Sequence, residues 1–88
     1  METLTIHKHK NFGLGPTVVW EMDGIASPIA EVYDLGGLYL VLLLCTTGGY
    51  IRATGNYTYV MSKARKWVIN MGPLFSTKPY GSVVISEE

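Results

Sequence analysis

Residues 38–45 read LYLVLLLC, and this uncharged stretch constrains the fold more than any other part of the chain. In an extended strand, successive side chains point to opposite faces, so both faces of this strand are apolar. Both faces must therefore be covered, as they are in a strand at the centre of a sheet. The apolar run from Leu35 to Cys45 is too short to span a bilayer as a helix, which needs about 20 residues. We therefore expect a buried central strand and no membrane segment.

The second strong pattern is helical and lies in TYVMSKARKWVINMG. Its apolar residues recur at helical spacing and form one stripe, made of Val60, Ala64, Trp67, Val68 and Met71. Thr58 can cap the start, and Gly72 followed by Pro73 ends the helix. The outer face carries the cations Lys63, Arg65 and Lys66. A helix over about 59–71 is therefore predicted to cover one face of the central strand.

The remaining segments read mostly as strands separated by turn residues. Alternating patterns predict strands at 3–9, 17–22 and 49–55, and a final hairpin in which 74–77 and 82–86 flank the turn KPYG. Residues 25–35 allow two interpretations. We expect a strand, because Asp-Gly before the segment and Gly-Gly after it resemble hairpin turns, and a short helix capped by Ser27 is the alternative.

These patterns predict one α+β domain over residues 1–88, with an antiparallel sheet of four to six strands and one main helix packed on one face. The cover of the second face is left open between the N-terminal hairpin and another subunit. Hydrophobic residues make up 48% of this short chain, so either the core is unusually full or some apolar surface binds a partner. We expect a homodimer in which acidic stretch 21–34 pairs with basic stretch 52–66. Its predicted interface is Tyr39, Val41 and Leu43.

No residue pattern predicts catalysis, a metal or a cofactor. His7 and His9 share one face of a predicted strand, but no further ligand lies nearby, so we interpret them as a solvated face. Cys45 follows leucines that do not stabilise a thiolate, and we interpret it as a small core residue. A single cysteine fits a reducing cytoplasm. We therefore expect a cytoplasmic protein that is not an enzyme.

One segment, IRATGNYTYVMSKARKW, interleaves basic and aromatic residues. Such a pattern can bind a phosphate backbone and stack on bases. The candidate binding residues, for nucleic acid or for a protein partner, are Arg52, Tyr57, Tyr59, Lys63, Arg65 and Lys66. The chain has seven basic and seven acidic side chains, so no overall field attracts it to nucleic acid. A small nucleic-acid-binding module is therefore the alternative function.

Residues 24–69 resemble a pattern of small proteins from tailed phages. The pattern runs from DG through IAEVYDLGGLYLV and GGYIRATG to the KARKWV segment, about half of the chain. The resemblance implies an antiparallel sheet with one helix. It also implies a phage-encoded, non-catalytic protein that binds and blocks a host or defence protein, as anti-CRISPR proteins do. It carries over no functional residue, and protein–protein contact is the function we expect first.

Overall fold

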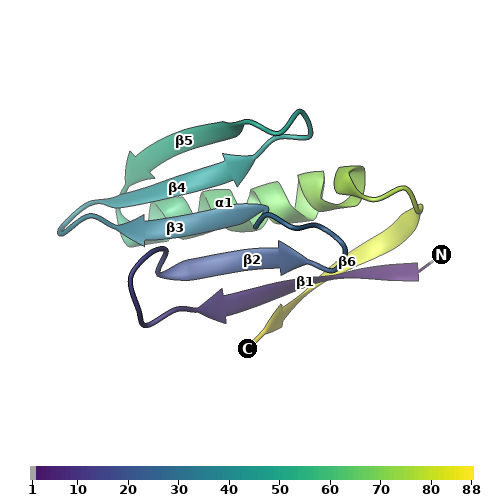
Figure 1. The fold of residues 1–88 in the computed structure, drawn as a ribbon, viewed down its shortest axis with the longest axis horizontal. Helices are drawn as coiled ribbons and strands as arrows, with labels where there is room; N and C mark the ends of the chain where they lie inside the picture. The colour runs from purple at the N-terminus through teal and green to yellow at the C-terminus, as the bar shows by residue number, and fades with distance from the viewer. Residues whose placement is uncertain (1) are drawn as a thin grey trace.

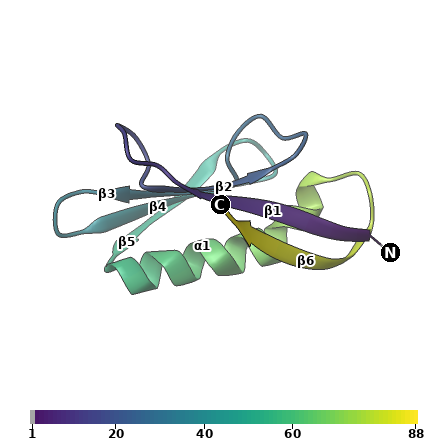
Figure 2. The same ribbon diagram turned by 90° about the horizontal axis from the view of Figure 1, so that it is seen from below.

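The structure is a computed structural model that describes residues 2–88. Its elements are β1 (Glu2–Lys10), β2 (Val18–Met22), β3 (Ala30–Asp34), β4 (Tyr39–Leu44), β5 (Tyr50–Gly55), α1 (Tyr57–Met71), the 3₁₀ helix η1 (Gly72–Phe75) and β6 (Tyr80–Glu87). The six strands form one sheet in the order β5-β4-β3-β2-β1-β6 (Figure 1). Figure 2 shows α1 packed on one face of that sheet. The predicted α+β class, with one helix on a mostly antiparallel sheet, is confirmed.

The C-terminal segment departs from the prediction. Residues 72–75 form η1, which takes up the first half of the predicted strand 74–77, because Pro73 suits the start of a tight helical turn. β6 then runs beside β1, and these two strands pair in parallel, whereas every other neighbouring pair is antiparallel. The predicted final hairpin is therefore wrong. The backbone N–H and C=O groups of β6 pair with the free edge of β1, so β6 and β5 form the two opposite edges of the sheet.

The ambiguous segment 25–35 contains strand β3, which confirms the strand interpretation for its second half. Gly24 adopts a positive φ of 83° in the turn that follows β2. The segment before β3 is nevertheless tied to the sheet through Ile29. The Ile29 N–H donates to the Trp20 carbonyl at 2.9 Å, and the Ile29 carbonyl accepts from Leu44 N–H at 3.0 Å. Ile29 is fully buried and belongs to the core.

Helix α1 begins two residues earlier than predicted. Its N-cap is Asn56, whose side-chain oxygen accepts a hydrogen bond from the Tyr59 N–H at 2.8 Å, so the expected cap Thr58 lies inside the first turn. The predicted apolar stripe does face the sheet, since its buried members are Val60, Ala64 and Val68. Trp67 is half-buried beside them, and its indole N–H donates to the Leu44 carbonyl at 2.9 Å.

α1 covers the face of β4 that carries Tyr39, Val41 and Leu43. Val41 and Leu43 are buried, with exposed fractions of 0% and 4%. The Tyr39 ring meets Tyr57 of α1 edge-on, with ring centroids 5.1 Å apart. Of these three residues, which were predicted as a dimer interface, Val41 and Leu43 therefore lie in the core of the chain, and Tyr39 is half-buried against it. The two faces of β4 are equally apolar in sequence, and α1 packs on the face that was predicted to meet a second subunit.

The opposite face of β4 carries Leu40 and Leu42, which are partly exposed. The strand pairing places Leu42 between Glu31 of β3 and Arg52 of β5. The N-terminal hairpin does not fold across this face, because β1 and β2 extend the same sheet. The loops on either side of β2 rise above it (Figure 2). In the described part of the chain this face is therefore open at Leu40 and Leu42, whereas Leu44 on the same face is buried.

The two faces of β4 predict opposite outcomes for neighbouring substitutions. Leu43→Asp would bury an unpaired carboxylate beneath α1 and should lower the free energy of unfolding by about 3–5 kcal/mol or more. Leu42→Asp, on the open face, should cost about 1 kcal/mol. Urea unfolding followed by circular dichroism measures both. Equal losses in the two variants would mean that the helix does not cover the Leu43 face.

Candidate protein-binding groove at the β5 edge

Strand β5 is an edge strand, because its neighbour in the sheet is β4 on one side only. All six β5 residues pair regularly with β4, from Tyr50 opposite Leu44 to Gly55 opposite Tyr39. The outer edge of β5 therefore presents backbone N–H and C=O groups that pair with no strand among residues 2–88. Ile51, in the middle of this edge, is 47% exposed. An open edge with an exposed apolar side chain is a template for another strand.

A groove of about 400 Å³ lies between β5 and α1. Its sheet side is formed by Leu43 and Ile51, and its helix side by Trp67 and Met71. The polar lining side chains are Lys63, Lys66 and Asn70. Apolar surface bordered by cations is typical of a site for a partner that carries both apolar and acidic groups.

The cations of the groove come from one flank of α1. Tyr59, Lys63, Lys66 and Asn70 follow one another at spacings of three or four residues, which aligns them along the helix. The Lys63 ammonium lies 5.6 Å from the centroid of the Tyr59 ring. Tyr59 in turn fits against Gly55, where an added Cβ would come within 2.6 Å of the ring. This close approach holds the start of the helix beside the end of β5.

Lys63, Lys66 and Arg52 make no ion pair with a carboxylate within residues 2–88. By contrast, the Lys8 ammonium lies 2.8 Å from a Glu87 carboxylate oxygen near the opposite edge of the sheet, where β1 and β6 pair. Arg52 points away from α1, since it alternates with Ile51, which lines the groove. Unpaired cations therefore stand on both faces of the β5 edge.

The structure brings together only part of the predicted basic and aromatic patch. Tyr59, Lys63 and Lys66 share one flank of α1. Arg65 lies on the other flank, where it lines a separate hollow of about 320 Å³ together with Lys8 and Glu87. Arg52 lies on the opposite sheet face, and Tyr57 packs against Tyr39. No continuous basic track joins the six residues.

Sequence reasoning missed the contribution of Ile51 and Asn70 to the groove, and it assigned Trp67 and Met71 to the core stripe alone. No local signal marks Ile51 as an edge residue, because edge position depends on the order of strands in the sheet. Asn70 had a weak signal, since it follows Lys63 and Lys66 at helical spacing.

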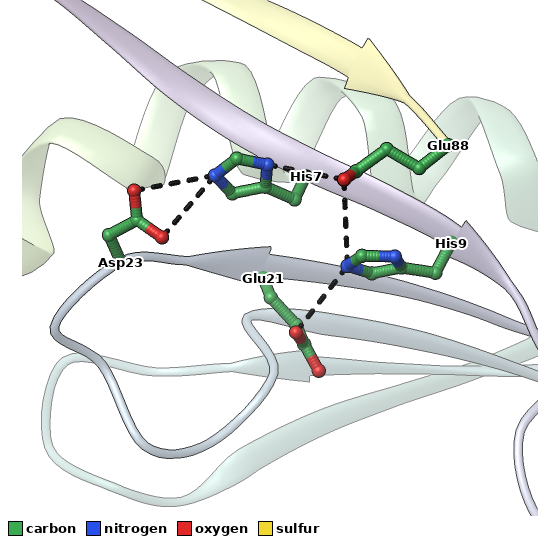
Figure 3. Close-up of polar contacts among 5 residues, drawn as sticks. All are labelled: His7, His9, Glu21, Asp23 and Glu88. Carbon is green, nitrogen blue, oxygen red and sulfur yellow. Dashed lines mark hydrogen bonds and ion pairs between the residues drawn. The ribbon is translucent and has the colours of Figure 1, made fainter.

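A second cluster lies on the open face, where β1 carries His7 and His9 (Figure 3). The imidazole of His7 lies 3.4 Å from the Asp23 carboxylate and 3.2 Å from that of Glu88. The Nε2 atom of His9 lies 3.5 Å from Glu21 and 3.7 Å from Glu88. No group of three or more His, Cys, Asp or Glu side chains within residues 2–88 has a geometry that holds a metal ion. The cluster instead ties the end of β6 to β1 and β2.

A larger hollow of about 450 Å³ lies at the start of β1, near η1. Its charged groups already have partners. Glu2 lies 3.9 Å from the Lys78 ammonium, and Asp23 contacts His7. Because the cations of the β5 groove lack such partners, we take the β5 groove as the candidate functional site.

The histidine cluster predicts a pH-dependent contribution to stability. The hydrogen bond with Asp23 raises the pKa of His7 above its ordinary value of 6.5, burial opposes this, and the charges of Asp23 and Glu88 add to it. A raised pKa in the folded state means that protonated His7 stabilises the fold. This contribution is fully present below pH 6.5 and disappears as the pH rises through the folded-state pKa.

Proton NMR titration of the His7 ring measures this pKa directly. It should lie above 6.5 in the wild-type chain and move back toward that value in Asp23→Asn. A wild-type value at or below 6.5 would show that the contact with Asp23 does not persist in solution.

Comparisons of the chain with protein-family models, with curated protein sequences and with solved structures found no match. None of the helices within residues 2–88 has the length and apolar character needed to cross a membrane.

Proposed function

We propose that this chain is a non-catalytic binding protein that contacts another protein through the β5 edge and the groove beside it. The observation that carries the proposal is the coincidence of three features at one place. These are an unpaired strand edge, an apolar groove with the exposed Ile51, and the cations Lys63 and Lys66, which have no carboxylate partner within residues 2–88. Each feature favours a protein partner, because strand edges, apolar clefts and free charges are the common elements of protein interfaces.

Nucleic-acid binding is less well supported than protein binding. A single strand is normally held in a continuous basic groove with stacking platforms along it. Here Arg52 and Arg65 lie on other surfaces than Lys63 and Lys66, and the rings near the two lysines are those of Tyr59 and Trp67. The formal net charge is zero, so long-range attraction to phosphates is weak.

The predicted homodimer receives no support from this edge. Two copies that paired their β5 edges about a two-fold axis would place Lys63 and Lys66 of both copies on the same face of the joined sheet. Neither copy would offer these lysines a carboxylate there, because the residues that line the groove include none. We therefore propose that the partner is a different protein. The homodimer stays a prediction from the sequence, and light scattering tests it.

Two narrower predictions concern the source of the chain and its location in the cell. That the chain is phage-encoded, and that it blocks a host or defence protein, follows from the sequence resemblance alone. A cytoplasmic location rests on the single Cys45, which is free in the structure. We keep these as proposals that the nature of the captured partner would test.

A matched pair of charge variants tests the proposed site. The immobilised chain is used to retain proteins from a nuclease-treated extract, and the retained proteins are quantified by mass spectrometry. Lys63→Glu/Lys66→Glu should abolish retention of the specific partner. Lys10→Glu/Arg65→Glu changes the net charge equally on surfaces away from the groove and should retain it.

Two results would contradict the proposed function. The first is equal retention by both double variants, which would place the contact elsewhere. The second is micromolar binding of a single- or double-stranded oligonucleotide in a fluorescence anisotropy titration, with a steep loss at higher salt. That result would favour the nucleic-acid alternative.

A further inference from the structure

We propose that the partner binds as an extended acidic segment that adds to the sheet as a further strand beside β5, with apolar residues directed into the groove. This inference rests on the proposed function, because it specifies what occupies the same site. The ligand is a strand whose side chains alternate between two faces, with carboxylates on both faces.

The backbone of β5 is suited to strand addition. Its pairing with β4 is regular over six residues, without a bulge that would turn the edge away. A strand added at the usual spacing of about 4.8 Å would lie directly over the groove between β5 and α1. The main chain would supply affinity, and alternate side chains would supply specificity.

The side chains of such a strand meet two different surfaces. On the helix side, a residue next to Ile51 enters the groove and contacts the half-buried Trp67. An apolar side chain fits there, because both neighbours are apolar and partly exposed. Residues before and after it on the same side reach Lys63 and Lys66, and carboxylates suit those positions.

On the open side, alternate residues of the added strand lie beside Arg52. The strand pairing places Arg52 next to Leu42, with Glu31 one strand further away. An acidic residue of the ligand would therefore lie one strand away from Arg52, whereas Glu31 lies two strands away. The resulting pattern is apolar residues flanked by acidic residues on the groove side, and acidic residues on the other side.

The second edge of the sheet is a poor site for the same ligand. β6 ends in Glu87, and Glu88 follows it, so an acidic strand would meet like charges there. The nearby cation Lys8 is already paired with Glu87 at 2.8 Å. The distribution of charge thus directs an acidic strand to β5 and not to β6.

A fluorescein-labelled peptide of sequence Glu-Glu-Val-Glu-Val-Glu-Glu tests the proposal. It presents two valines flanked by carboxylates on one face and three carboxylates on the other. Anisotropy titrations at low salt should show saturable binding to the full chain. Affinity should fall about tenfold or more with Lys63→Glu/Lys66→Glu and with Arg52→Glu, and should be unchanged with Lys10→Glu/Arg65→Glu.

Two control peptides separate strand addition from simple charge attraction. Replacing the central glutamate of the peptide by proline keeps most of the charge but removes a backbone N–H, so binding should be lost. A lysine-for-glutamate version should not bind. Equal binding of the proline peptide would overturn strand addition, because charge alone would then explain the affinity.

Two further outcomes would overturn the inference. No binding of the acidic peptide at millimolar concentration would do so, and the proposed function would still stand if retention of a protein depended on Lys63 and Lys66. A dimer seen by light scattering that Lys63→Glu/Lys66→Glu abolishes would show that a second copy occupies the groove. Circular dichroism of each variant confirms that loss of binding is not loss of fold.

Discussion

The packing of α1 on one face of β4 determines the other features of this structure. β4 is apolar on both sides, and the helix stripe of Val60, Ala64 and Val68 removes one side from water. Because the stripe fixes the rotation of the helix, it also fixes where the flanks point. One flank faces the β5 edge and carries Lys63 and Lys66 into the groove. A contact that stabilises the core thereby creates the candidate binding surface.

Local sequence patterns predict the helix and strands of this chain better than they predict which strands pair with one another. The helix is predicted from the helical spacing of its apolar residues, and β4 from an unbroken apolar run. Both occur where these patterns place them. The position of β6 beside β1 is not encoded in its own neighbourhood. The prolines and glycines around it fit a hairpin, but the free edge of β1 offers a longer partner in space. Parallel pairing between distant segments leaves no local turn signal.

The candidate site is predicted in part for the same reason. The cations of the helix flank are visible as a pattern, whereas the edge position of β5 follows from the strand order. Alternation along the strand also does not show which face of LYLVLLLC the helix covers, since both faces are equally apolar. Leu43 and its alternating neighbours therefore lie under the helix, although they were predicted to meet a partner. Topology decides which apolar residues remain exposed.

Amide hydrogen exchange along the two sheet edges, measured by NMR on the ¹⁵N-labelled chain, is the most direct test that β5 accepts a strand. In the free protein, the outward-facing amides of β5 should exchange rapidly, because no strand covers them among residues 2–88. Saturation with the acidic peptide should slow these β5 amides and leave β6 unchanged. Protection at β6, or slow exchange along the whole of β5 before any peptide is added, would contradict the account.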